Sequence, residues 1–236
     1  VKDRIWFFTS YRYLLGNNAV AGAFYADGRQ AVDDDTLKQG VGRVTWRANA
    51  NHKISYFYEL TKKFRGHDGL VAGVDEIASN RRPPVHYSNL QTKWTGTLTP
   101  RMLIESGFSR NVTKFNVVYQ QGVKELPFTP AWYAKASRQD TLLSTRHVAG
   151  VVEQYNIPIR NTLTSAISYV TGSHAFKWGY QWGFGFYDQR REANADLIQV
   201  YRNGVPSSVN VQNTPVFSRP VMKAASARAH SRLLRF

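Results

Sequence analysis

The segment TGSHAFKWGYQWGFGFYDQRRE, residues 171–192, decides the fold class of this chain. Every second residue from 176 to 186 is aromatic: Phe176, Trp178, Tyr180, Trp182, Phe184 and Phe186. The residues between them are small or polar: Lys177, Gly179, Gln181, Gly183 and Gly185. A β-strand directs successive side chains to opposite faces, so this segment predicts a strand with one aromatic face and one polar face. Whether the aromatic face meets a protein core or lipid decides the class of protein.

Similar alternation recurs along the chain, and helical periodicity is nearly absent. The strand candidates lie at 3–13, 37–48, 53–64, 89–98, 102–115 and 160–170. Short polar turns are expected near 49–52, 99–101 and 171–174. Long stretches rich in Gly, Asp and Arg are expected as loops near 15–35, 66–87, 116–158 and 189–208. All the short turns fall at one end of the strands and all the long stretches at the other, which is the parity of an up-and-down antiparallel sheet.

This arrangement predicts an all-β fold, a partial antiparallel up-and-down transmembrane β-barrel with about seven to eight strands of a larger barrel. Transmembrane barrels pair short periplasmic turns with long extracellular loops, and their strands need roughly 9–11 residues to cross a bilayer. Tryptophans support the prediction, because aromatic residues gather at membrane interfaces. The expected interface aromatics are Trp6, Trp46, Trp94, Trp178 and Trp182. The alternative is that the aromatic stripe packs in the core of a soluble β-sandwich or barrel.

Composition narrows the function classes. The 236 residues contain no apolar run long enough for a transmembrane helix, which needs roughly 20 residues. The first residues, VKDRIWFFTS, do not form a secretory signal, and we expect the chain to be an internal piece of a longer protein. Cysteine is absent, which excludes disulfides and thiolate metal sites. The net charge of +15 is scattered among aromatics, which favours a solvated surface over a nucleic-acid partner.

Three segments, in order along the chain, resemble the Oar-like group of TonB-dependent outer-membrane receptors. VKDRIWFFTSYRY (1–13) resembles the strand that opens their barrel, and TGSHAFKWGYQW (171–182) resembles their G-x-H turn and following strand. YRNGVPSSVNVQNTP (201–215) resembles the outer-loop segment that comes next. The resemblance implies a 22-stranded barrel in the bacterial outer membrane, with a plug and TonB-energised uptake. It also implies contact with the lipid bilayer, with lipopolysaccharide, and with the TonB complex through a plug that this chain lacks.

We therefore expect residues 1–222 to form a partial barrel domain of such a receptor, and residues 223–236 to form a basic tail outside the barrel. The tail contains Lys and Arg, no acid, and no alternation. The transported substrate is unidentified, and the extracellular loops are expected to bind it. The alternatives are a passive porin-like barrel and a soluble basic β-sheet protein that binds nucleic acid or polysaccharide.

No catalytic arrangement stands out, so we expect no enzyme activity, no cofactor and no metal site. The six histidines are dispersed, and DDD (33–35) lacks the spacing of a dedicated cation site. The basic segment NRRPP (80–84) is expected at a loop tip, where its arginines can meet an anionic ligand. In the loop 127–140, aromatic residues stand between prolines, where they either contact a ligand or pack the loop. The candidate ligand-binding residues are Arg81, Arg82, Phe128, Trp132 and Tyr133.

Overall fold

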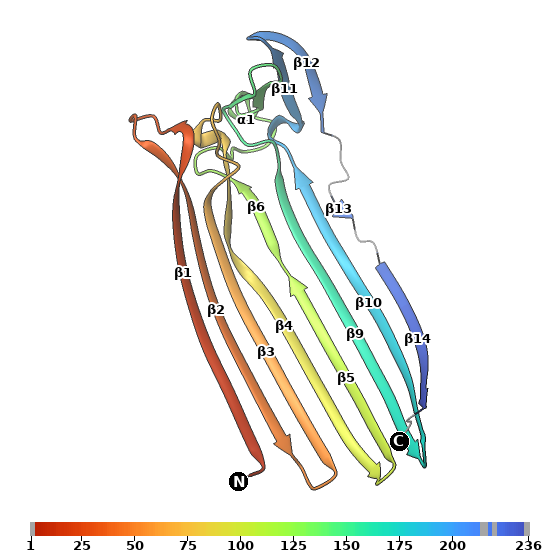
Figure 1. The fold of residues 1–236 in the computed structure, drawn as a ribbon. Coiled ribbons are helices and arrows are strands. Elements are labelled where there is room, and N and C mark those ends of the chain that lie inside the picture. The colour runs from red at the N-terminus through yellow and green to blue at the C-terminus, as the bar shows by residue number, and fades with distance from the viewer. Residues whose placement is uncertain (1–2, 213–216, 219–220, 234–236) are drawn as a thin grey trace.

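A computed structural model describes residues 3–212, 217–218 and 221–233. Figure 1 shows long strands that lie side by side in one curved sheet, with a smaller folded region at one end of it. The order of the large sheet is β1-β2-β3-β4-β5-β9-β10-β13, while β14 pairs with β10 and β6 pairs with β4 and β9. Every pair in this sheet is antiparallel, and the path has eight strand positions in the described part of the chain. The predicted fold class and strand number are confirmed.

The long strands run from one end of the sheet to the other. Their bounds are β1 Ile5–Phe24, β2 Gln30–Arg47, β3 His52–Asp68, β4 Asn80–Thr99, β5 Met102–Thr113, β9 Glu153–Thr171 and β10 His174–Glu192. The shorter members are β6 Phe115–Tyr119, which follows β5, and β13 Phe217–Ser218. The chain meanders from each strand to its neighbour, with an excursion of the chain between β6 and β9.

The short turns lie together at the lower end of Figure 1, near the N-terminus, as predicted. They connect β2 to β3, β4 to β5 and β9 to β10. In the first of them, the side-chain Oδ1 of Asn49 accepts hydrogen bonds from the backbone N–H groups of Asn51 and His52, both at 2.9 Å. This local side-chain bond is typical of Asx turns and fixes a compact connection.

The predicted loops at the opposite end are shorter than expected, because the strands continue into them. Residues 15–35 were expected to form a loop, but β1 and β2 stay paired through Gly16↔Asp35 and Asn18↔Asp33. NRRPP (80–84) was expected at a loop tip and instead begins β4. The prediction was wrong because a polar composition is not specific to loops. A polar strand pair satisfies its backbone hydrogen bonds as well as an apolar pair does.

The excursions at this end fold into a cap on the sheet, which we define as residues 120–152 and 193–212. It contains α1 Pro130–Ala134, η2 Asn194–Asp196 and a four-stranded sheet of order β12-β11-β7-β8. The strands of that sheet are β7 Ser137–Asp140, β8 Thr145–His147, β11 Leu197–Arg202 and β12 Val205–Val211. Beside the cap, η1 Glu76–Ala78 lies in the β3–β4 connection. The segment that resembles an outer loop, 201–215, thus contains part of a hairpin. Asn203 and Gly204, with φ of 53° and 78°, form its two-residue turn.

The basic tail departs from the expectation. The backbone of β14, Val221–Leu233, pairs with β10 from Phe186↔Val221 to His174↔Leu233, so it extends the sheet instead of leaving it at residue 223. Main-chain pairing requires only a free strand edge, and the missing alternation that suggested a tail does not prevent it. Residues 234–236 lie outside the described part of the chain.

Buried apolar residues occur only at the cap end of the described chain. They form small clusters, such as Ala23, Ala31 and Leu70, or Tyr119, Val123 and Ala149. Along the rest of the large sheet the aromatic side chains are exposed or half-buried: Phe7 is 81% exposed and Trp178 is 49% exposed, while Trp182 and Phe184 are half-buried. The large sheet is therefore a single layer with no protein core against its aromatic side, which is not how a β-sandwich packs.

Candidate functional site

The strand register sorts the residues of the large sheet onto two faces. Directly paired residues share a face. One row across seven strands is Ile5, Trp46, Ile54, Trp94, Ser106, Ser165 and Tyr180. The adjacent row is Trp6, Thr45, Ser55, Lys93, Gly107, Thr164 and Gln181. We call the face with Tyr180 the aromatic face and the face with Lys93 the polar face. The sequence stripe 176–186 continues across the whole sheet as the aromatic face.

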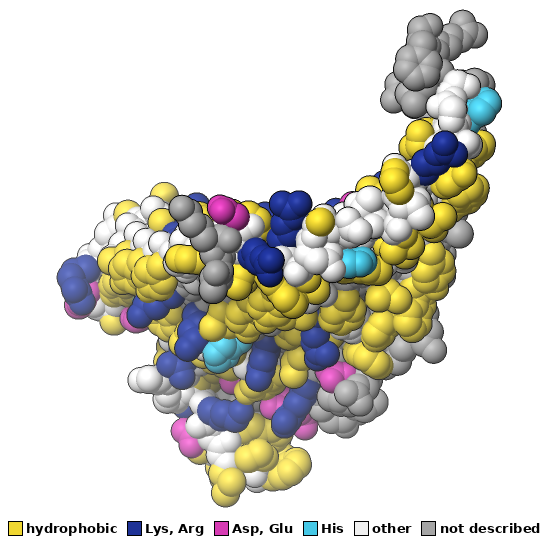
Figure 2. All heavy atoms as spheres, turned by 90° about the horizontal axis from the view of Figure 1, so that it is seen from below, with side chains coloured by type: hydrophobic (Ala, Val, Ile, Leu, Met, Phe, Trp, Pro, Cys, Tyr) yellow, Lys and Arg dark blue, Asp and Glu magenta, His cyan; other side chains and the backbone are white. Residues whose placement is uncertain are grey.

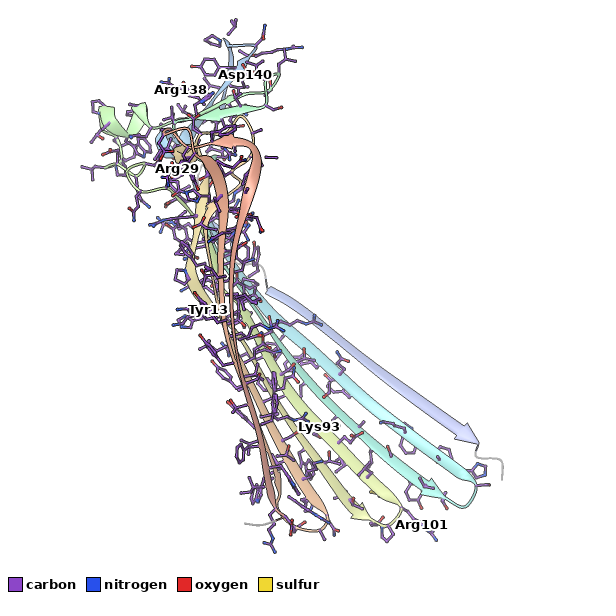
Figure 3. All side chains as sticks on the ribbon, turned by 60° about the vertical axis from the view of Figure 1, so that its left-hand side comes forward. Tyr13, Arg29, Lys93, Arg101, Arg138 and Asp140 are labelled. Carbon is purple, nitrogen blue, oxygen red and sulfur yellow. The ribbon has the colours of Figure 1, made fainter. Side chains whose placement is uncertain are left out.

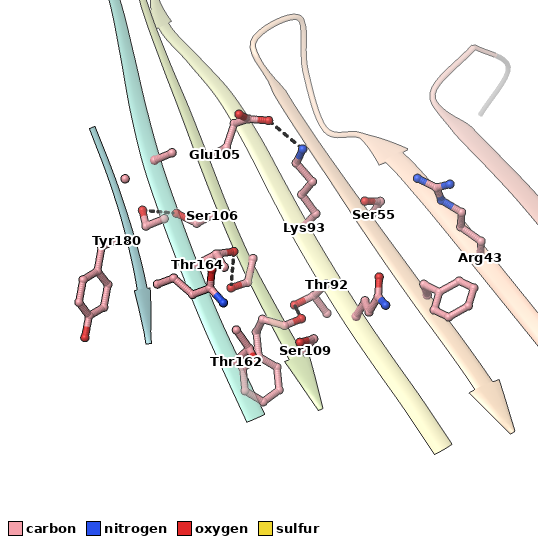
Figure 4. A pocket seen from close by; sticks show the side chains of 18 residues that line it. Arg43, Ser55, Thr92, Lys93, Glu105, Ser106, Ser109, Thr162, Thr164 and Tyr180 are labelled. Atoms are coloured by element: carbon pink, nitrogen blue, oxygen red, sulfur yellow. Dashed lines mark hydrogen bonds and ion pairs between the residues drawn. The ribbon is translucent and has the colours of Figure 1, made fainter. Parts of the chain in front are cut away.

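The polar face lines most of a hollow of about 910 Å³, and a few aromatic-face residues at its margin, such as Thr92, Ser106 and Tyr180, also contribute to the lining (Figure 4). Hydroxyl, amide and charged side chains from β2, β3, β4, β5, β9 and β10 surround it. They include Arg43, Ser55, Gln91, Lys93, Glu105, Ser109, Thr162, Thr164 and Gln181. A polar concave side and an apolar outer side are the two faces of a transmembrane barrel wall.

Ion pairs between side chains of three strands cross this hollow. Glu105 of β5 lies 2.7 Å from Nζ of Lys93 of β4 and 3.2 Å from Nζ of Lys177 of β10. Glu105 is the only carboxylate among the residues that line the hollow, and both of its oxygens are engaged. The hollow therefore offers polar contacts and a cationic excess, rather than a paired acid and base.

The aromatic face has a limited apolar span. Along β3 it runs from Ile54 through Tyr56, Tyr58 and Leu60 to Lys62, a distance of roughly 27 Å at about 3.4 Å per residue. On a strand tilted by roughly 40°, that length spans a height of roughly 21 Å, close to the apolar band of roughly 25 Å on outer-membrane barrels. Figure 2, from the short-turn end, shows hydrophobic side chains gathered in a band along the sheet. Within this span, the hydroxyls of Ser106 and Ser165 lie 2.9 Å apart, so one donates a hydrogen bond to the other.

Four of the five predicted interface tryptophans lie on the aromatic face: Trp46, Trp94, Trp178 and Trp182. Near the short-turn end, Trp94 stacks on His52, and its Nε1 donates to Nδ1 of that ring at 3.3 Å. Trp182 lies further up β10, beside Phe184 at a ring distance of 4.7 Å. Trp6 lies on the polar face, opposite Thr45, and its place at the membrane interface stays a prediction. Three aromatics, Trp6, Phe7 and Phe8, follow one another there, and position in the chain alone did not show which of them points outward.

The predicted ligand residues Arg81 and Arg82 lie at the start of β4, near the cap. Nε of Arg82 lies 2.8 Å from Asp68, and Arg65 binds Asp68 at 2.6 Å as well as Asp33. The hydrogen bond from Arg65 lowers the pKa of Asp33, against the opposing effect of burial. These ion pairs engage the carboxylates of Asp33 and Asp68, which a metal cation would require as ligands. Among the described residues, no group of three or more His, Asp or Glu side chains is arranged to hold a metal ion.

The predicted aromatic trio of the cap lies together. The ring of Trp132 is 5.3 Å from that of Phe128 and 5.0 Å from that of Tyr133. Trp132 is buried, with 7% exposed, against Ala136 and Ala195, whereas Phe128 is 76% exposed and Tyr133 is 49% exposed. Thr129 begins the helix: its hydroxyl accepts from the N–H of Trp132 at 3.2 Å. Trp132 therefore packs the cap, while Phe128 and Tyr133 are available to a ligand.

Sequence reasoning missed Asp140, which joins the two parts of the cap. Its carboxylate accepts hydrogen bonds from the N–H groups of Leu142 and Leu143 at 2.9 Å, of Asn203 at 3.1 Å and of Gly204 at 2.6 Å. These donors hold the pKa of the Asp140 carboxyl below its usual range, with the Gly204 amide making the largest contribution. Figure 3 shows Asp140 and Arg138 at the end of the molecule away from Arg101 and the short turns. The dipeptide Asn203-Gly204 predicts a turn, but the sequence around it does not indicate that its N–H groups bind Asp140, 63 residues earlier.

No helix in the described part of the chain is long and apolar enough to cross a membrane. No protein-family model and no curated protein sequence matches this chain. Among solved structures, the chain is similar to the outer membrane transporter YddB from Escherichia coli, with a TM-score of 0.59 and 9% sequence identity. The similarity covers 99% of this chain and 30% of that transporter. The chain thus has the fold of part of an outer-membrane transporter barrel and spans about a third of the length of that protein.

Proposed function

We propose that this chain forms part of the wall of a TonB-dependent receptor in the bacterial outer membrane, of the Oar-like type that its sequence resembles. The observation that carries the proposal is the division of one sheet into an exposed aromatic face and a polar face that lines a hollow. Only closed barrels satisfy all backbone groups of a sheet in hydrocarbon. Within the described residues β1 and β14 end the sheet, so the complete barrel requires further strands.

The uptake mechanism places substrate binding at the cap and passage along the polar face. Phe128 and Tyr133 present two exposed rings at the cap, and the hollow below offers hydroxyl and cationic contacts. The partners in this proposal are lipid, an unidentified substrate and the TonB complex, which acts through a plug outside this chain. The proposal includes no cofactor, no enzyme activity and no nucleic acid.

Cysteine labelling in cells tests the TonB requirement. The chain contains no cysteine, so a single Ser55→Cys substitution places one thiol in the hollow and Leu142→Cys places one on the exposed cap. A membrane-impermeant maleimide is added to cells that carry the complete protein, with and without TonB. We expect Ser55→Cys to react several times faster when TonB is present, because the plug blocks the hollow until it is displaced.

The cap variant Leu142→Cys is the control and should react equally in both strains. Equal and fast labelling at Ser55→Cys in both strains would show a passive porin. A hollow that stays unlabelled in both strains, while the cap reacts, would contradict a transport path along the polar face.

A further inference from the structure

Three basic side chains stand in one cross-strand row on the aromatic face. Lys38 of β2 pairs directly with Lys62 of β3, and Lys62 pairs with His86 of β4. All three are exposed, and the row continues to Tyr13 of β1, whose ring lies 5.6 Å from Nζ of Lys38. Figure 3 shows Tyr13 midway along its strand, between the short-turn end and the cap.

The row lies at the upper edge of the apolar span. Lys38 is eight positions from Trp46, Lys62 is eight from Ile54, and His86 is eight from Trp94, all on the same face. The cap is on the same side of this edge as the long connections. In the orientation of the proposed function, the row therefore lies at the level of lipid head groups in the outer leaflet.

These three side chains form no ion pair with any described residue. The nearby acids are engaged elsewhere: Asp34 lies 2.7 Å from Nδ1 of His67, and Asp35 lies 3.7 Å from Nζ of Lys63. Like charges directly opposite each other destabilise a strand pair. An anion held between Lys38 and Lys62 would remove that repulsion.

Below Lys38 the aromatic face has a furrow along β2. The face positions there are Gly40 and Gly42, and a Cβ at either would have no neighbour within 4 Å. Their partners on either side are larger: Tyr11 and Leu60 flank Gly40, and Thr9 and Tyr58 flank Gly42. The furrow therefore has a glycine floor, larger side chains on both sides and a lysine at its upper end.

We propose that Lys38, Lys62 and His86 bind the phosphate of an anionic lipid of the outer leaflet, with one acyl chain in the furrow over Gly40 and Gly42. The two lysines match the phosphate charge, and the furrow matches an acyl chain in position and polarity. A soluble anion would use the cations but not the furrow. This inference rests on the proposed function, because it requires that the aromatic face meet lipid.

The test uses the complete protein in phosphatidylcholine nanodiscs that contain a small fraction of diphosphoryl lipid A, and native mass spectrometry counts the lipid A retained. We expect Lys38→Gln with Lys62→Gln to lower retention roughly thirtyfold, since each of the two lysines near a head group contributes on the order of 1 kcal/mol. The matched control, Arg47→Gln with Lys53→Gln, removes the same charge from the polar face and should retain lipid A as the wild type does. Gly42→Val fills the furrow, keeps the charge and should also lower retention.

Each outcome decides the inference. Unchanged retention in the Lys38→Gln, Lys62→Gln protein, or equal loss in the Arg47→Gln, Lys53→Gln control, would overturn it. Loss with the lysine variant but not with Gly42→Val, together with displacement of lipid A by inorganic phosphate, would show a soluble-anion site and overturn the lipid assignment. Failure of the wild type to insert in nanodiscs would instead overturn the proposed function itself.

Discussion

Tyr58→Arg will destabilise the inserted barrel by about 2–4 kcal/mol, while Phe57→Arg will change its stability by less than about 1 kcal/mol. The two aromatic residues are adjacent in β3 and differ in the face they occupy. Tyr58 lies on the aromatic face midway between Ile54 and Lys62, near the centre of the apolar span, and Phe57 lines the polar hollow. A guanidinium that faces the middle of a bilayer loses its hydration, whereas one in a water-filled lumen keeps it.

Urea unfolding of the complete protein in lipid vesicles measures both variants against the wild type. Because both variants replace an aromatic residue with arginine in one strand, differences in strand propensity largely cancel. A larger loss for Phe57→Arg than for Tyr58→Arg would mean that the polar face is the buried one, and the membrane orientation of the sheet would be wrong.

Trp132→Ala will lower the local stability of the cap by about 3–5 kcal/mol, the usual cost of deleting a buried large aromatic side chain. Its ring fills the space between α1 and η2 beside Ala136 and Ala195. Tyr133→Ala, at the next position, removes a side chain that is 49% exposed and should cost much less.

Hydrogen–deuterium exchange of the complete protein measures this difference in peptides that cover 130–136 and 194–202. We expect faster exchange there in Trp132→Ala, with the strands β1 to β5 unchanged, because the cap cluster is separate from the clusters beside those strands. Equal exchange in the two variants would show that Trp132 does not support the cap, and its role as a ligand contact would again be open.

Much of the sheet could be predicted because alternation is local. The alternation from Phe176 to Phe186 shows which residues of this strand share a face. The strand register then extends that assignment to the neighbouring strands. Short turns such as 49–52 also carry their own signal, since Asn49 bonds to the backbone within three residues. The prediction that the stripe faces lipid rested on strand length, the placement of turns and loops, the tryptophans and the polarity of the second face.

The upper half of the molecule was harder to predict because its contacts are not local. The strand extensions near Asp33 and Arg82 have polar sequences without alternation. Ion pairs between neighbouring strands connect them instead, and these pairs cannot be predicted from the local sequence. Asp140 binds amides of Asn203 and Gly204, which are far away in the sequence. The row Lys38–Lys62–His86 becomes visible only when the register places three separate strands side by side.

The most direct test of the central claim is a depth scan of β10. Single spin labels at positions 176 to 186 of the complete protein, in bilayers, report accessibility to oxygen, which enters lipid, and to a polar nickel reagent, which stays in water. We predict that even positions favour oxygen and odd positions favour nickel, because the even side chains share the aromatic face with Tyr180 and the odd ones share the polar face with Gln181. Even positions shielded from both reagents would show that the aromatic face packs against protein, and the barrel-wall account would be contradicted.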